Sequence, residues 1–315
     1  MRLIARPGGA LNGRFIVPGD RVLSQLSLVL GALTPGETVI AGLLETDDTL
    51  ATAAALRTLG VRVEHFGPTR WRVFGGATAL PIDWAPPERA FGIDLVRDGA
   101  NIRLCDPTTP ATLLHIPGDP TAASFALAAA ALVPGSEVTV PDLLLAPARS
   151  GFIMALQRLG ADLRLDDVRG RSGETIGSVR VRHTPLFGAE FTPDEIPSMI
   201  DEIPALAMVA AGARGETRIE GLAAQGATLA TGLTACGVSA YAQDDTLIIV
   251  GRPDIPGGAA VATHGDPAIA MAFASLGLAA TAPIEVDHAE TIAATFPTYR
   301  EAMRAIGADL VLSGT

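Results

Sequence analysis

The pattern of apolar and polar residues is clearest over residues 113–140, LLHIPGDPTAASFALAAAALVPGSEVTV. A short apolar stretch predicts a β-strand, and Pro117-Gly118-Asp119 ends it because proline lacks an amide donor and glycine permits a sharp turn. Nearly every residue from 121 to 133 is Ala, Leu, Phe or Val. Such a helix is apolar around most of its circumference, so we expect it to be buried between sheets. Pro134-Gly135 then ends the helix, and a second strand is expected at 137–140.

The same order of elements is repeated along the chain. Residues 14–40 again read as a strand, a Pro-Gly-Asp turn, an apolar helix and a strand, and residues 203–220 and 266–287 repeat the helix and the following strand. A second helix ending in glycine follows each copy, and these four helices are expected at 48–60, 148–160, 226–237 and 298–307. This internal repetition predicts an α/β (α+β) fold of four β-α-β-α-β-β units, whose sheets enclose the apolar helices.

Residues 75–112 do not follow the repeat. They contain several prolines and show no helical periodicity, although short strands are expected at 93–96 and 101–104. We interpret this segment as an irregular connector or as the remnant of a larger region.

The chain is long enough for two domains. The chain has 315 residues, 48% of them hydrophobic, with a mean hydropathy of +0.35, and this length allows two full cores. The longest apolar run, residues 125–133, is far too short to span a bilayer. The N-terminal MRLIARPGG lacks the apolar core of a signal peptide, so we expect a soluble, cytoplasmic protein without a membrane partner. The net charge of −11 argues against nucleic acid as a partner.

Several chemistries are excluded by residues that the chain lacks. All 23 basic residues are arginines, for which a bias in codon usage is the simplest explanation, and mechanisms that need lysine, such as a Schiff base or a Walker P-loop, are excluded. Cys105 and Cys236 have no partner spacing, so we expect two reduced thiols. The five histidines show no metal-ligand spacing, and the sequence predicts neither a metal nor a cofactor.

The first Pro-Gly-Asp turn supplies one group of candidate site residues, which are Asp20, Arg21 and Ser24. Such a turn places the N–H groups of a helix start at the end of a strand, which is a general anion-binding arrangement. Arg21 could hold a phosphate or a carboxylate through a bidentate contact. The alternative is a solvated arginine at the edge of a lobe.

A second group lies at the start of two later helices. Asp201 and Glu202, in SMIDEIP, precede a helix that is expected to be buried. They are either helix caps or carboxylates that face a ligand, one of them as a general base. Arg149, in APARSG, is either a partner of a helix cap or a ligand contact.

The repeats and three phrases resemble the enolpyruvyl transferases, and within them the 5-enolpyruvylshikimate-3-phosphate synthases. The phrases are LNGRFIVPGD, then HIPGDPTAASFALAAAALVPGSEVT with APARSGFIMALQRLGADL, and then PSMIDEIPALAMVAAGARGETRIEGL. The C-terminal GGAAVATHGDPAIAMAF and IAATFPTYREAMRAIGADL are similar to the closing unit of that family. The resemblance covers residues 1–77 and 100–315. It implies two lobes, each an inside-out α/β barrel, with substrates in the cleft between them.

The resembled family has six units, whereas four are visible here. The second unit and most of the third are missing, so we expect a reduced N-terminal lobe at 19–111 and a C-terminal lobe of three units at 1–18 and 112–315. The loss removes neighbours of the helix at 22–33. We expect residues 75–112, the C-terminal lobe or a second copy of the chain, as a homodimer, to cover it.

Most substrate-binding motifs of the family are changed. The family's Pro-Gly-Asp-Lys-Ser reads PGDRV here, with Arg21 in place of lysine and Val22 in place of serine. The family's Asn-Ala-Gly-Thr, Ser-Ala-Gln and Lys-Glu-Ser-Asp-Arg segments are missing, and Asp266-Pro267-Ala268 replaces Asp-His-Arg. Within the family's substrate-contacting set, Asp201 is unchanged and Arg21 is a partial substitute.

The resemblance implies 3-phosphoshikimate 1-carboxyvinyltransferase activity, which transfers enolpyruvate from phosphoenolpyruvate to shikimate-3-phosphate in aromatic amino-acid biosynthesis. On this interpretation Asp201 is catalytic, and the residues that bind these small anionic substrates are Asp20, Arg21, Ser24, Arg149 and Glu202. Because several cationic positions are lost together, efficient catalysis is not expected. The alternative is an inactive member of the family that acts as a binding or interaction protein.

Overall fold

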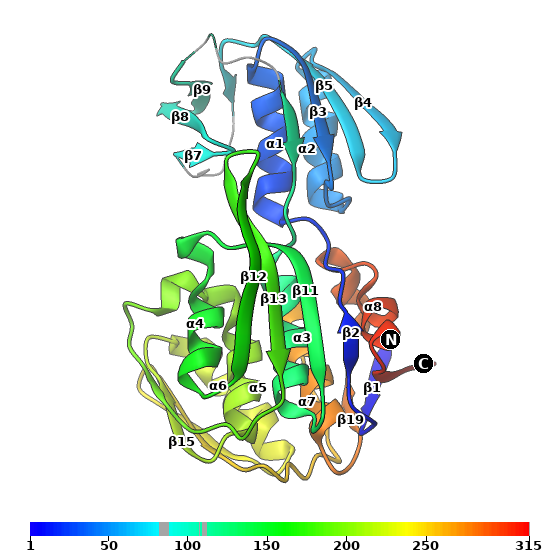
Figure 1. Cartoon of the computed structure of the whole chain (residues 1–315), viewed down its shortest axis with the longest axis vertical. Coiled ribbons are helices and arrows are strands. Elements are labelled where there is room, and N and C mark those ends of the chain that lie inside the picture. Colours follow the sequence, from blue (N-terminus) through cyan, green and yellow to red (C-terminus); the bar gives the residue numbers. More distant parts are fainter. Residues whose placement is uncertain (82–87, 107, 109–111, 315) are drawn as a thin grey trace.

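The computed structural model describes residues 1–81, 88–106, 108 and 112–314. Figure 1 shows two lobes, with both termini in the larger one, which is drawn below. Each lobe contains its own cluster of buried apolar side chains. Among the described residues, no helix combines the length and the apolar character that crossing a bilayer requires.

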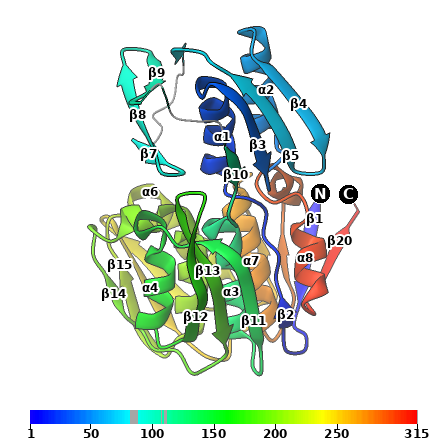
Figure 2. The same ribbon diagram turned by 45° about the horizontal axis from the view of Figure 1, so that its top comes forward.

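Three helices form the interior of the larger lobe. They are α3 (Pro120–Leu132), α5 (Ile203–Gly212) and α7 (Pro267–Ala279), and each packs against the other two. Nearly all of their side chains are buried, because these helices are apolar on every face and lie among the sheets of the lobe (Figure 2). The lobe also contains α4 (Gly151–Arg158), α6 (Ala223–Ala235), α8 (Tyr299–Ala305) and the 3₁₀ helices η1 (Pro147–Arg149), η2 (Ile196–Ser198), η3 (Ile200–Glu202) and η4 (Ala289–Ala294).

Three four-stranded sheets belong to the larger lobe, with the orders β18-β19-β1-β20, β12-β13-β11-β2 and β14-β15-β17-β16. Their strands are β1 (Arg2–Arg6), β2 (Asn12–Arg14), β11 (Glu137–Leu144), β12 (Asp162–Arg171), β13 (Glu174–Arg182), β14 (Glu190–Phe191), β15 (Gly215–Ile219), β16 (Ser239–Gln243), β17 (Thr246–Gly251), β18 (Ala260–Val261), β19 (Ile284–Val286) and β20 (Asp309–Ser313).

The smaller lobe is built on α1 (Arg21–Leu33) and α2 (Asp47–Thr58). Its main sheet has the order β10-β3-β5-β4, formed by β3 (Gly36–Ala41), β4 (Arg62–Gly67), β5 (Arg70–Gly75) and β10 (Leu113–His115). In this sheet β10 is parallel to β3, and the other two pairs are antiparallel. The three sheets of the larger lobe show the same sequence of one parallel and two antiparallel pairs.

The segment 75–112 is more regular than the sequence indicated. Strands β6 (Leu80–Pro81), β7 (Arg89–Ala90), β8 (Ile93–Asp98) and β9 (Asn101–Leu104) form a further sheet in the order β6-β9-β8-β7. The two strands predicted at 93–96 and 101–104 are confirmed, whereas the description of the segment as irregular was wrong for the residues that the structure describes. The sequence signal was weak because β6 and β7 have only 2 residues each. The rest of the segment, at 82–87, 107 and 109–111, lies outside the described residues.

This small sheet covers α1. Leu80, Leu95 and Ile102 belong to the same buried cluster as Leu26 and Leu30 of α1. One of the covers expected for this helix, the segment 75–112, is therefore confirmed, and covering α1 requires no second copy of the chain.

The helices predicted from the repeat are present, with ends that differ by a few residues. The predicted helix at 22–33 corresponds to α1, the one at 121–133 to α3, and the one at 226–237 to α6. Strand β10 pairs with β3, so residues 113–115 add a strand to the sheet of the smaller lobe.

The chain crosses between the lobes twice, and the two crossings are joined. Gly19 and Gly118 lie opposite each other in an isolated bridge. The Asp20 N–H donates to the Pro117 carbonyl (2.8 Å), and the Asp119 N–H donates to the Pro18 carbonyl (3.0 Å). A side chain at Gly19 would collide with the backbone of Gly42, so the glycine of this Pro-Gly-Asp turn is needed for close approach.

The β12–β13 hairpin forms a further contact between the lobes, and Figure 1 shows it extending to the smaller lobe. Glu174 Oε1 accepts a hydrogen bond from the Phe91 N–H (2.7 Å). The Ser172 hydroxyl accepts one from the His115 N–H (3.1 Å). The smaller lobe is therefore held both at the two crossings and at the tip of this hairpin.

Candidate functional site

A pocket of about 290 Å³ lies where the two crossings meet the larger lobe. Most of its lining comes from the starts of α1, α3 and α7, and residues from η1, η3 and α6 and from the segment after η4 complete it. The lining residues are Arg21, Val22, Asp119, Thr121, Ala122, Phe125, Arg149, Ile200, Asp201, Gln225, Asp266, Pro267, Ala268, Met271, Thr295 and Phe296.

Three helices start at this pocket, and an aspartate caps each of them. Asp20 accepts from the Leu23 N–H in α1 (2.9 Å), Asp119 from the Thr121 N–H in α3 (2.8 Å), and Asp266 from the Ala268 N–H in α7 (2.8 Å). The positive ends of three helix dipoles therefore converge on one space, an arrangement that favours a negatively charged group. The caps themselves already supply part of that negative charge.

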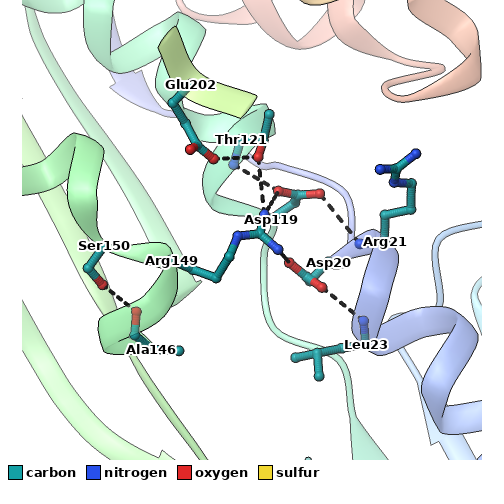
Figure 3. A network of polar contacts seen from close by, with 9 residues as sticks. All are labelled: Asp20, Arg21, Leu23, Asp119, Thr121, Ala146, Arg149, Ser150 and Glu202. Carbon is teal, nitrogen blue, oxygen red and sulfur yellow. Dashed lines mark hydrogen bonds and ion pairs between the residues drawn. The ribbon is translucent and has the colours of Figure 1, made fainter. Parts of the chain in front are cut away.

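The guanidinium of Arg149 lies between the caps of the two lobes (Figure 3). Its Nη1 is 3.3 Å from Asp20 Oδ2, and its Nη2 is 3.5 Å from Asp119 Oδ1. Nη2 also donates to the Thr121 hydroxyl (3.1 Å). The side chain is only 25% exposed, so Arg149 joins α1 of the smaller lobe to α3 of the larger lobe. These contacts favour the interpretation of Arg149 as a partner of the helix caps over its interpretation as a ligand contact.

Two buried carboxyl groups adjoin this arginine. Burial raises the pKa of Asp20, which is 1% exposed, to about 6; Asp119 adds to the rise and Arg149 opposes it. Burial also raises the pKa of Glu202, which is 2% exposed, to about 7, against the lowering effects of Thr121 and Arg149. The Thr121 hydroxyl donates to Glu202 Oε1. Thr121 thus connects Glu202 to the arginine, and Glu202 lies behind the pocket wall.

Asp201 and Glu202 are adjacent in sequence but differ in environment. Asp201 is exposed and lines the pocket, and its carboxylate has no hydrogen-bond or ion-pair partner in the described part of the chain. Within that part, no side chain caps α5 through a hydrogen bond. The capping alternative is therefore not supported for these two residues, and Asp201 is the carboxylate available to a ligand.

Arg21 and Ser24, both in the first turns of α1, also differ. The Arg21 guanidinium is exposed and points away from the Arg149 cluster (Figure 3), and it has no partner among the residues described. Ser24 is fully buried, and its hydroxyl accepts a hydrogen bond from the Leu44 N–H (3.0 Å). Ser24 therefore contributes to the interior of the smaller lobe.

Five polar residues of the pocket were not among the predicted site residues. They are Asp119, Thr121, Gln225, Asp266 and Thr295. A signal for Asp119 was present, because it ends the second Pro-Gly-Asp turn. Asp266 similarly precedes a buried helix, but nothing in the sequence separates its role from that of an ordinary cap. Thr121 and Gln225 lie in stretches without a distinguishing pattern.

The described residues contain no group of three or more His, Cys, Asp or Glu side chains that could hold a metal ion. Cys105 is exposed, Cys236 is buried, and both are free thiols. Burial raises the pKa of Cys236 to about 12, so this thiol stays protonated near neutral pH. Neither cysteine lines the pocket.

Solved structures share this fold over the whole chain. An EPSP synthase from Acinetobacter baumannii superposes with a TM-score of 0.86 at 24% identity, covering 100% of both chains. The enolpyruvyl transferase NikO from Streptomyces tendae gives 0.75 at 14% identity, covering 100% of this chain and 99% of that chain. The fold is thus that of enolpyruvyl transferases, as the resemblance implied.

Sequence comparisons identify the particular family. The family model described as EPSP synthase (3-phosphoshikimate 1-carboxyvinyltransferase) matches residues 5–82 and 89–303. A 3-phosphoshikimate 1-carboxyvinyltransferase from Caulobacter vibrioides is 32% identical over 435 residues, covering 98% of both chains, and one from Parvibaculum lavamentivorans is 33% identical over 436 residues, covering 98% of this chain and 97% of the relative. The chain belongs to the EPSP synthase family.

Proposed function

We propose that this chain is a member of the EPSP synthase family that has lost detectable carboxyvinyl transfer and retains a ligand-binding pocket between its lobes. The relatives are named for the transfer of a carboxyvinyl group. In the family's reaction this group passes from phosphoenolpyruvate to shikimate-3-phosphate. The observation that carries the proposal is the ion-pairing of Arg149 with Asp20 and Asp119. It leaves Arg21 as the lining cation without a partner among the residues described.

The charge balance is unfavourable for that transfer. Both substrates are phosphorylated carboxylates, so several cations must offset their charge as they come together. The lining contains two arginines and three aspartates, with Asp201 and Asp266 facing the same space as Arg21. Removing a single preorganised donor from an active site typically lowers the rate about 10²–10³-fold. The motifs changed in this chain remove several such donors.

Asp201 is the best-placed carboxylate for proton transfer, and it is the residue on which any remaining catalysis would depend. It is exposed at the pocket and lies two residues before the start of the buried helix α5. Burial raises the pKa of Glu202 to about 7, but the group lies behind Thr121 and does not line the pocket. We therefore assign the catalytic position, where any activity remains, to Asp201 and give Glu202 a supporting role.

The loss of substrate-binding residues fits a shortened chain. The alignment with the Caulobacter relative spans 435 residues, whereas this chain has 315, so the alignment places long gaps in this chain. We assign these gaps to the missing second unit and most of the third, which leaves four units in place of six. The division then has a reduced N-terminal lobe at 19–111 and a C-terminal lobe at 1–18 and 112–315, with β10 contributed to the smaller lobe.

The test is the release of orthophosphate from shikimate-3-phosphate and phosphoenolpyruvate at high protein concentration. We expect no release above a sample without protein. Asp201→Ala is the informative variant, and Asp194→Ala, at an exposed aspartate elsewhere on the larger lobe, is the matched control. Release that persists in Asp194→Ala and disappears in Asp201→Ala would contradict the proposal and show a rebuilt active site.

A further inference from the structure

The charges that line the pocket indicate which ligand it accepts. We propose that the pocket binds a small monoanion with hydroxyl groups, and that it discriminates against the phosphorylated form of the same molecule. This inference rests on the proposed function, in which the pocket between the lobes is the ligand site. It concerns the class of ligand and is independent of turnover.

Arg149 is not available to a second anionic group. Its two terminal nitrogens lie within 3.3 and 3.5 Å of Asp20 and Asp119, and its remaining contact is with Thr121. One guanidinium is shared by two buried carboxyl groups. A ligand phosphate would have to compete with both of them and would leave a buried carboxylate unpaired, which is costly.

Arg21 can anchor one anionic group. It is the first residue of α1, where Asp20 already accepts from the Leu23 N–H (2.9 Å), so the anchoring group is the side chain of Arg21. Its backbone N–H is partly occupied, because it donates to Asp119 Oδ2 at 3.4 Å. Its guanidinium is exposed and unpartnered in the described chain. A single carboxylate, held by a forked guanidinium contact, matches this position.

Asp201 and Asp266 favour hydrogen-bond donors over a second anionic group in the ligand. Both line the same pocket as Arg21, and carboxylates accept hydrogen bonds and repel anions. Asp266 already accepts from the N–H groups of Ala268 (2.8 Å) and Ile269 (3.2 Å), while Asp201 has no partner among the described residues. Hydroxyl groups of a ligand would supply the donors that Asp201 lacks, whereas a phosphate would meet like charge.

Size and lining favour one compact ligand. The volume of about 290 Å³ is at the lower end of the range of roughly 300–1,000 Å³ typical of small-molecule sites. Phe125, Met271 and Phe296 close the inner side of the pocket and are buried, whereas the lining residue Ile200 is 44% exposed. Ile200 can pack against the carbon ring of one hydroxylated carboxylate, while Arg21 holds its carboxylate.

Calorimetric titration of the full chain with shikimate and with shikimate-3-phosphate tests the inference, because the two probes share one skeleton and differ by the phosphate. We expect shikimate to bind at least about tenfold more tightly, since like-charge contacts in a site are strongly unfavourable. Arg21→Gln should weaken shikimate binding by about tenfold or more. Arg6→Gln, at an exposed arginine of β1 outside the pocket, should leave binding unchanged.

Asp201→Asn separates charge from shape. The amide keeps the size of the side chain and removes its charge, so the preference for shikimate over shikimate-3-phosphate should fall or reverse. Equal or tighter binding of the phosphorylated probe by the unmodified chain would overturn the inference, and so would a failure of both probes to bind. Release of orthophosphate would overturn the proposed function but would leave the measured preference between the probes as it is, so the two failures are distinguishable.

Discussion

Helices α1 and α3 each have 13 residues and each follow a Pro-Gly-Asp turn that supplies the capping aspartate, yet different partners bury them. Helix α3 packs against α5 and α7 inside the larger lobe. Helix α1 has no such pair of equivalent helices in the described chain, and it packs against α2, β3, β5 and β9. The same local motif therefore specifies a buried helix without specifying what buries it.

The difference shows how the smaller lobe can persist with fewer repeats. An apolar helix needs cover on every side, because each exposed apolar Å² costs roughly 25 cal/mol. In the larger lobe the neighbouring helices and sheets supply that cover. In the smaller lobe the sheet β6-β9-β8-β7 supplies part of it, although the sequence of that segment resembles a connector.

We expect the largest effect on stability where the sheet β6-β9-β8-β7 packs against α1. Ile102 of β9 is 1% exposed and belongs to the cluster that contains α1. Ile102→Ala should lower the free energy of unfolding by roughly 2–5 kcal/mol, as large-to-small core substitutions do. Urea unfolding followed by circular dichroism would measure the change.

Arg103→Ala is the control for that experiment, because Arg103 is the next residue of β9 and is exposed. Its substitution should change stability by no more than about 0.5 kcal/mol. If Ile102→Ala cost as little as Arg103→Ala, the small sheet would not be the cover of α1.

A second prediction concerns the start of α3, beside which Glu202 is buried. The folded-state pKa of about 7 lies above the ordinary value of 4.5, so the folded protein holds a proton that the unfolded chain releases more readily. The contribution of protonated Glu202 to the free energy of unfolding is therefore complete below about pH 4.5, and it is lost as the pH rises through 7. At pH 8 the ionised group should cost about 3 kcal/mol.

Glu202→Gln removes the charge and keeps an oxygen that can accept from Thr121. This variant should exceed the wild type in the free energy of unfolding at pH 8 by up to about 3 kcal/mol, and the two should agree near pH 4.5. Glu190→Gln, at an exposed glutamate of β14, should show no such pH dependence. A difference between Glu202→Gln and the wild type that stays constant with pH would contradict this account of Glu202.

The smallest expected effect is at the hairpin tip that joins the lobes away from the pocket. Gly173 has φ +79°, and a Cβ there would collide with the backbone of Phe91 and Gly92. Gly60 has a similar φ of +87° but open space around it. Gly173→Ala should cost roughly 1–3 kcal/mol more than Gly60→Ala, because only the former adds a steric clash. If thermal unfolding showed the same loss of stability for both variants, the hairpin tip would accommodate the added Cβ without a measurable penalty.

Much of the fold follows from the sequence pattern, because apolar helices bounded by Pro-Gly-Asp and Pro-Gly turns leave few arrangements. The small sheet of the smaller lobe was only half predicted, since strands as short as β6 and β7 have no readable period. Asp20, Asp119 and Arg149 were visible as residues, but their meeting was not, because they come from separate turns and the pairing of the crossings brings them together. The burial of Glu202 next to the exposed Asp201 depends on η3, a 3₁₀ turn that the pattern of apolar and polar residues does not predict.

Phosphorus NMR of shikimate-3-phosphate and phosphoenolpyruvate, mixed with an excess of protein, tests the central claim most directly. Every substrate molecule then has a site available, so even a single slow turnover would produce an orthophosphate signal. The account predicts that no such signal appears. An orthophosphate signal that grows with the wild-type chain and is lost with Asp201→Ala would contradict it.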